Sequence, residues 1–185
     1  MLKMTLFFFL LQISINLIAQ NTDSLKCWSS RDKLTWIDFR GKIPNSNYHR
    51  NAATCYELDA IPERKNGRLD YIVTLSFKRY ESWTTDTSSQ DMLLHEQLHF
   101  DIAELYARKL RKAIQNVARS IRQPTSKDFV PLIQKLYAEN SRMQEEYDKN
   151  TIHGVDLKAQ KNWNKKVFFQ LEELKNLAST IQNCK

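Results

Sequence analysis

The chain has 185 residues, of which 42% are hydrophobic and 26% charged, with 3 glycines and 4 prolines. This composition excludes disordered, collagen-like and linker-rich chains, because those classes are poor in apolar residues or rich in Gly and Pro. The formal net charge is +7, yet no Lys/Arg block is longer than two residues, whereas a nucleic-acid-binding arm concentrates its charge. We therefore expect one globular domain and no nucleic-acid partner.

The first nineteen residues have the pattern of a secretory signal peptide. A basic start at Lys3 precedes a mostly apolar run over residues 5–18, and Ala19 supplies a small residue at a cleavable junction. The run is short and is interrupted by polar residues, which is unfavourable for a membrane span; an uncleaved anchor is the alternative. We expect residues 20–185 to form a single secreted or periplasmic domain, with no stable membrane insertion after cleavage.

Export changes how the three cysteines are interpreted, because disulfides persist in oxidising compartments. Cys27, Cys55 and Cys184 allow one bridge at most. Cys27 and Cys184 stand near the ends of the mature chain and can tie them together, whereas Cys55 lies in an expected strand and can be a small buried residue. The sequence does not choose the pair.

The first part of the mature chain predicts a small sheet. Residues 20–33 are polar and are expected to be a loose lead-in, and the aromatic-rich segment Leu34–Gly41 can be a strand or a docked turn. Residues 52–61 indicate a strand that ends at Pro62. Strict alternation over Leu69–Phe77 predicts a second strand, and the Asn-Gly pair before it favours an antiparallel hairpin with one buried face.

From residue 88 onward, apolar residues recur at helical spacing. A first helix with a serine cap is expected over residues 88–122, and a second over residues 126–154. A third begins after Asp156, and its apolar stripe comprises Trp163, Val167, Leu171, Leu174, Ala178 and Ile181. The order of elements predicts an α+β fold in which a small N-terminal antiparallel sheet precedes three long helices.

The candidate chemistry is concentrated at His95, Glu96 and His99, which form an HExxH motif on the first expected helix. Histidines four residues apart lie one turn above each other, so both imidazoles can reach one Zn²⁺, and the glutamate beside them can take a proton from metal-bound water. A helical wheel places the two histidines at the border of the apolar stripe, where the floor of a cleft is expected. The alternative interpretation is a helix with two surface histidines and a salt-bridging glutamate.

A catalytic zinc ion needs a third protein ligand. On the helical wheel, Asp101 and Glu104 lie on a different side of the helix from the two histidines. This position favours outer-shell, capping or surface roles for both. His153 is the strongest candidate, because it stands before Gly154 at a helix break, where the alternative is a histidine favoured by the helix dipole. The other candidates are Glu139, Glu145 and Glu146 on the second helix and, less favoured, His49.

Three groups of residues resemble the DUF922 family of predicted secreted zinc-dependent proteases. They are Leu34–Gly41 with Ala52–Thr54, the string HEQLHFDIAE over His95–Glu104, and Tyr147–Gly154 followed by Gln160 and Trp163. The resemblance spans nearly the whole mature chain, and the extended string is far more specific than HExxH alone. It implies a zincin-like helix, zinc, a secreted or periplasmic location and proteolysis, and it supports His153 as a functional position.

These observations predict a metalloprotease that hydrolyses peptide bonds of a protein or peptide substrate. Zn²⁺, or alternatively cobalt or manganese, would be held by His95, His99 and His153, and Glu96 would be the general base. Tyr147 can donate to the developing oxyanion, although a tyrosine at this spacing is also typical of a core. The strand over Leu69–Phe77 could bind an extended substrate along an open edge.

Two other function classes remain open. A non-catalytic zinc-binding envelope protein would have the same ligands, and an amidase acting on cell-wall material would use the same metal chemistry.

Overall fold

The computed structural model of the protein describes residues 23–45 and 51–184. The predicted signal peptide and His49 lie outside these described residues. Among the helices that are described, none combines the length and the apolar character needed to cross a membrane.

A three-stranded antiparallel sheet forms the base of the fold. β4 (Arg68–Lys78) is its central strand and lies between β1 (Leu25–Cys27) and β3 (Tyr56–Lys65). Asn66 and Gly67 form the turn between β3 and β4, and both have a positive φ. Asparagine and glycine are the residues that adopt this left-handed conformation most readily. The predicted hairpin is therefore confirmed. β3 covers one edge of β4 along its length, and β1 covers the other edge only opposite Ser76–Lys78. Among the described residues no strand pairs with that second edge over residues 68–75, so an open edge that binds a substrate stays a prediction.

The sheet differs from the prediction at two points. β1 replaces part of the expected loose lead-in, since Leu25–Cys27 pairs with the end of β4. β3 continues through Pro62 to Lys65 instead of ending at Pro62. β3 is an edge strand of this sheet. Pro62 lies opposite Tyr71, at a position where the backbone nitrogen points away from β4. The N–H that proline lacks would therefore not have bonded to β4.

Two shorter features flank this sheet. The aromatic-rich segment forms a docked 3₁₀ turn, η1 (Trp36–Asp38), so the alternative of a strand is wrong. A separate two-stranded sheet pairs β2 (Ala52–Ala53) with β5 (Trp83–Thr84).

Three helices complete the α+β fold: α2 (Gln90–Ser120), α3 (Ser126–Thr151) and α4 (Leu157–Glu173). The Ser89 hydroxyl caps α2 by accepting a hydrogen bond from the backbone N–H of Met92. All three begin and end close to the predicted positions, except that α4 ends eight residues before Ile181. There the chain forms two 3₁₀ turns, η2 (Lys175–Leu177) and η3 (Ile181–Asn183), and the Ile181 side chain is exposed.

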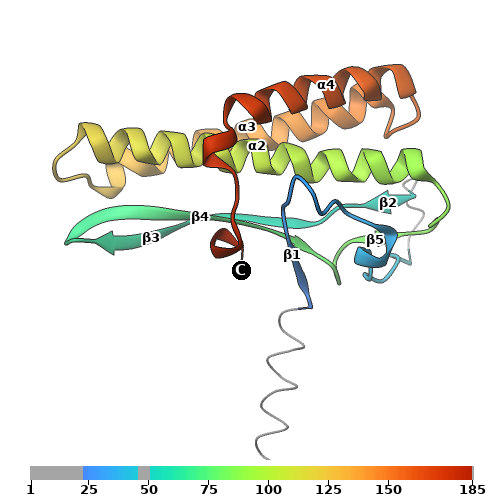
Figure 1. The fold of residues 1–185 in the computed structure, drawn as a ribbon, viewed down its shortest axis with the longest axis horizontal. Helices are drawn as coiled ribbons and strands as arrows, with labels where there is room; N and C mark the ends of the chain where they lie inside the picture. Colours follow the sequence, from blue (N-terminus) through green and yellow to red (C-terminus); the bar gives the residue numbers. More distant parts are fainter. Residues whose placement is uncertain (1–22, 46–50, 185) are drawn as a thin grey trace, which may run out of the picture.

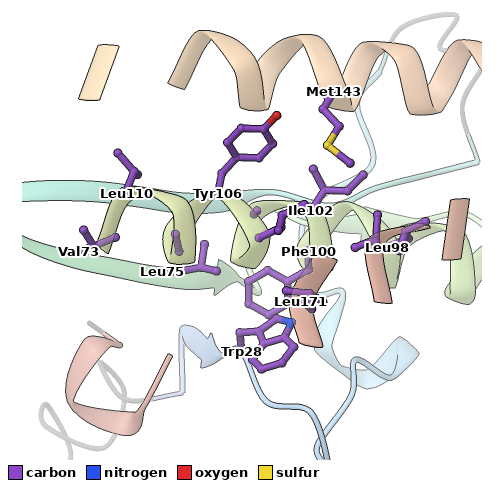
Figure 2. Close-up of a cluster of buried hydrophobic side chains, with 14 of the residues drawn as sticks. Trp28, Val73, Leu75, Leu98, Phe100, Ile102, Tyr106, Leu110, Met143 and Leu171 are labelled. Atoms are coloured by element: carbon purple, nitrogen blue, oxygen red, sulfur yellow. The ribbon is translucent and has the colours of Figure 1, made fainter. Parts of the chain in front are cut away.

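α2 is the centre of the core. It lies along the sheet, with α3 and α4 on its other side (Figure 1). Its side chains at Ile102, Leu105 and Leu110 are fully buried, because both faces of this helix are covered. Figure 2 shows the core that α2 forms with β4, α3, α4 and the N-terminal segment; the labelled residues are Trp28, Val73, Leu75, Leu98, Phe100, Ile102, Tyr106, Leu110, Met143 and Leu171.

Glu104 and Asp101 do point away from the histidines, but neither is a simple surface charge. Glu104 is fully buried, and its carboxylate accepts hydrogen bonds from Arg108 Nε (2.7 Å) and from the backbone N–H of Ser179 (2.8 Å). Asp101 Oδ1 accepts from Trp28 Nε1 at 2.7 Å. The interpretation of Glu104 as an exposed charge is wrong, since a buried carboxylate requires such partners. Glu104 thereby attaches the C-terminal segment to α2.

A disulfide joins Cys27 in β1 to Cys184 in the C-terminal segment, whereas Cys55 is free and partly buried. It closes a loop with a sequence separation of 157 residues. Together with the Glu104 contacts, it holds both ends of the described chain on the sheet and α2.

Removing this bridge should destabilise the fold. The double variant Cys27→Ser/Cys184→Ser should lose about 2–5 kcal/mol of unfolding free energy, because a long cross-link restricts the unfolded chain. Denaturant unfolding measures the loss, with Cys55→Ser as a control expected to change by less than about 1 kcal/mol. Equal stability of the double variant and the wild type would contradict the assigned clamp.

Candidate metal centre

The HExxH motif lies in the first turns of α2, at the end of the molecule where β2 and the turn between α3 and α4 also lie (Figure 1). A cavity of about 590 Å³ opens between these elements. It is lined by residues 51–54, by His95, Glu96 and His99 of α2, and by the last turns of α3 with the segment that follows. Its volume is within the usual range for small-molecule sites.

Three candidate ligand atoms converge in this cavity. The Nε2 atoms of His95 and His99 lie 3.3 Å apart. Asp148 Oδ1, from the last turn of α3, lies 3.2 Å from the first of these atoms and 2.9 Å from the second. The two histidines are one turn apart on α2, so both rings leave the helix on the same side. Two helices therefore supply a His95–His99–Asp148 group that could hold a metal ion.

Two glutamines fix the state of the imidazole rings. His95 Nδ1 lies 3.1 Å from Gln160 Oε1, and His99 Nδ1 lies 2.6 Å from Gln144 Oε1. The amide groups are oriented by their own donors, since Gln144 Nε2 donates to the His99 carbonyl and Gln160 Nε2 donates to Asn164 Oδ1. Both glutamine oxygens are therefore acceptors, and the hydrogen-bond network assigns a proton to each Nδ1. In the neutral rings, each Nε2 is then free to bind a cation.

This arrangement brings two ring nitrogens and a carboxylate oxygen together at one point, where their lone pairs repel one another unless a proton or a metal ion lies between them. A tetrahedral zinc ion with ligand distances of about 2.0–2.2 Å separates its ligand atoms by roughly 3.3–3.5 Å. The distances between the three atoms, 2.9, 3.2 and 3.3 Å, are close to that spacing. Two imidazoles and one carboxylate are also a donor set that zinc accepts.

The charges around the three convergent atoms also favour a cation between them. Burial alone would raise the pKa of the Asp148 carboxyl, but the hydrogen bonds and charges of the two histidines outweigh it and hold that pKa far below its usual range. Burial alone would lower the pKa of His99, but Asp148 and Glu96 outweigh it and raise that pKa. The cavity therefore favours a positive charge at the point where the three atoms meet.

Glu96 has an unusual environment for a carboxylate. Its side chain is buried and lines the cavity, yet Oε2 has no hydrogen-bond partner among the described residues. Such burial costs about 1–3 kcal/mol or more for a charged group. Because Glu96 lines the cavity, its carboxylate is placed to accept a proton from a water molecule bound there.

Tyr147 lies behind the histidines instead of facing the cavity. Its ring is fully buried and stacks on His95 with 4.7 Å between ring centroids, and its hydroxyl donates to Gln160 Oε1 at 2.7 Å. Burial raises the pKa of the phenol further above its usual range. The geometry thus favours a positioning role for Tyr147 and does not support its suggested role as a donor to an oxyanion.

His153 lies at the mouth of the cavity. It follows the left-handed cap of α3, and its half-exposed ring has Nδ1 at 3.4 Å from Asp148 Oδ2. The structure brings His153 to the site but not to the point where the three atoms meet. Gly154, at φ +85°, packs on His95: a Cβ here would lie 3.0 Å from His95 Cγ. This close approach and the positive φ both require glycine.

Asp148 and Gln160 were named only as part of the family resemblance, and Gln144 not at all; none of the three was predicted to contact the histidines. A usable signal existed, because Gln144 and Asp148 are four residues apart on the second helix, the spacing of the two histidines that they contact. Of the glutamates considered as ligands, Glu145 lines the cavity but contributes no atom to the convergent group among the described residues.

Comparison with known proteins gives one match. The model of the family described as "Bacterial protein of unknown function (DUF922)" matches residues 72–154, which supports assignment of the chain to that family. The match begins in β4 and ends at the glycine after α3, and so contains His95, Glu96, His99, Asp148 and His153. No curated protein and no solved structure matches the chain significantly.

Adding a methyl group at Gly154 should weaken metal binding. In Gly154→Ala, the new Cβ strains the backbone and displaces the His95 ring, which should lower metal affinity about 10–100-fold, as loss of a ligand's support typically does. Gly67→Ala is a matched control, since Gly67 also has positive φ but has no atom within 4 Å of the added Cβ. Chelator competition measures both affinities; equal losses in the two variants would contradict the contact-based explanation.

Proposed function

We propose that this protein is an exported zinc-dependent hydrolase that cleaves peptide bonds. The observation that carries the proposal is the convergence of His95 Nε2, His99 Nε2 and Asp148 Oδ1 in a cavity that Glu96 also lines. A metal bound only for structure needs a closed set of ligands, whereas this group has three and opens into a cavity, as a catalytic site requires.

The proposed ligands are His95, His99 and Asp148, with zinc as the favoured ion. Asp148 replaces His153 of the sequence-based prediction because its Oδ1 lies near both Nε2 atoms. His153 then holds the second oxygen of Asp148 at the mouth of the cavity. Zinc, when bound, supplies an acidified water molecule and polarises the carbonyl of the scissile bond.

The protein's own residues supply the proton transfer and the positioning. Glu96 takes a proton from the attacking water as the new C–O bond forms, and then passes it to the nitrogen of the leaving amine as the C–N bond breaks. Gln144 and Gln160 hold the imidazole rings in the tautomer that ligation needs. Tyr147 holds Gln160 and packs beneath His95.

Export is part of the proposal. The signal-like sequence over residues 1–19 and the Cys27–Cys184 disulfide both favour an oxidising compartment, secreted or periplasmic.

The ligand set is tested by metal content. Residues 20–185, purified without added metal, should contain one zinc per chain, and Asp148→Asn should lose at least about tenfold in affinity, as His99→Ala should, because each removes a ligand. His153→Ala should retain the ion. If His153→Ala loses zinc and Asp148→Asn retains it, the third ligand is His153 and not Asp148.

Catalysis is tested by Glu96→Gln. This variant should keep its zinc and be at least as stable to unfolding as the wild type, because a buried charge is removed, but it should lose about 10²–10⁴-fold in turnover, since the general base is removed. Denatured casein and peptidoglycan fragments are suitable substrates. Turnover of peptidoglycan alone would favour the amidase, and turnover unchanged by Glu96→Gln would contradict the mechanism.

A further inference from the structure

A second cavity, of about 530 Å³, runs along a different face of α2 from the metal centre. On α2 its lining extends from Gln90 to Arg108, which at 1.5 Å per residue is about 27 Å of helix. The second half of α4 forms another wall, and the segment before η1 forms a third. We call this cavity the α2–α4 groove. It shares no lining residue with the cavity of the metal centre.

Apolar side chains line the groove along its length. They include Trp28, Leu34, Leu94, Leu98, Phe168 and Leu171. Figure 2 labels Trp28, Leu98 and Leu171, which lie at the edge of the core. Leu94 and Phe168 are 52% and 58% exposed, although both are large apolar side chains. A ligand with an apolar body would remove this surface from water, which favours binding.

The polar side chains in the middle of the groove already have partners. Gln97 Oε1 accepts a hydrogen bond from the Leu34 backbone N–H at 2.7 Å. Asp101 accepts hydrogen bonds from Trp28 Nε1 and from Lys33 Nζ. Two of the walls are helices, whose backbone groups are paired within each helix. The groove therefore offers few free partners to the amides of a bound peptide, whereas an acyl chain needs none.

Arg108 places a buried positive charge at one end of the groove. This residue is 3% exposed and is the last residue of α2 in the lining. Its Nε donates to Glu104 Oε1 at 2.7 Å, and its Nη1 donates to the Leu171 carbonyl at 2.6 Å. Its Nη2 has no hydrogen-bond partner among the described residues. A buried guanidinium nitrogen favours an acceptor, and a ligand in the groove can supply one.

The charges at this end do not balance among the described residues. Arg108 and Arg111 share the single carboxylate of Glu104, with Arg111 Nη1 at 3.9 Å from Oε1. Lys175 and Glu172 also line this end of the groove and offset each other. One positive charge is therefore left over, and an anionic group would compensate it.

We propose that the α2–α4 groove binds a fatty acid, with its acyl chain along the apolar side chains and its carboxylate on Arg108 Nη2. A carboxylate accepts strong, charge-assisted hydrogen bonds from a guanidinium group. Lys175 lies four residues after Leu171, whose carbonyl Arg108 contacts, and adds a second cation to this end. The inference goes beyond the proposed function and does not depend on it, because the metal centre contributes no residue to the groove.

A series of head groups tests the assigned charge. Zinc-loaded, ¹⁵N-labelled residues 20–185 are titrated with octanoate, octanol and octyltrimethylammonium, each below its critical micelle concentration. The shift of the Trp28 indole N–H reports binding, since Trp28 lines the groove. Octanoate should bind about tenfold or more tightly than octanol, because octanol lacks the charge that strengthens the hydrogen bonds. The cationic amphiphile should bind more weakly still. Equal affinities for the three, or no binding of octanoate, would overturn the proposal.

Chain length tests the apolar part of the site. Decanoate should bind about fivefold or more tightly than octanoate, because two more methylene groups are removed from water. An affinity that does not change between octanoate and decanoate would contradict an acyl chain lying along the groove.

A variant pair locates the ligand on the protein. Phe168→Ala should weaken octanoate about fivefold or more, because its ring lines the groove beside Leu171. Leu157→Ala is the matched control, since Leu157 is also on α4 and 55% exposed but does not line the groove, and this variant should bind like the parent. Both side chains are more than half exposed, so both variants should fold. Octanoate held by the metal centre instead would bind Phe168→Ala as tightly as the parent, and that result would reject the groove.

Discussion

The hydrogen bonds that two imidazoles donate to two glutamine oxygens determine what this site can do. By accepting the Nδ1 protons of His95 and His99, Gln160 and Gln144 turn both Nε2 lone pairs toward Asp148. The two Nε2 atoms and the carboxylate oxygen can lie this close together when a positive charge is shared between them, either the proton of an imidazolium or a metal ion. This arrangement is the basis of our proposal that His95, His99 and Asp148 hold a metal ion.

The scaffold holds the two halves of this group at fixed positions. α2 is covered by the sheet on one side and by α3 and α4 on the other (Figure 1), so its first turns cannot move independently of the core. The ligands of α2 thereby face the end of α3 across a rigid interface. At the far side of the helix, Glu104 and the Cys27–Cys184 bridge attach the C-terminal segment. The buried Glu104 carboxylate has hydrogen-bond partners there, whereas Oε2 of the buried Glu96 has none among the described residues.

The helices and the hairpin could be predicted because their signals lie in neighbouring residues: the spacing of apolar residues, the cap at Ser89 and the turn at Asn66–Gly67. Prediction from local pattern failed where distant segments decide the structure. β1 is a strand because the end of β4 pairs with it, and the chain leaves α4 before Ile181 because Glu104 binds the segment after it. The HExxH residues were identified from spacing alone, but the candidate third ligand depends on how α3 packs against α2, which no single-helix wheel contains.

The central claim is that Asp148 completes a zinc site with His95 and His99. Anomalous diffraction at the zinc edge from crystals of the zinc-loaded chain tests it most directly. The account predicts one peak per chain, about 2.0–2.2 Å from both Nε2 atoms and from a carboxylate oxygen of Asp148. A peak bonded to His153 instead of Asp148, or no peak between the two histidines, would contradict it.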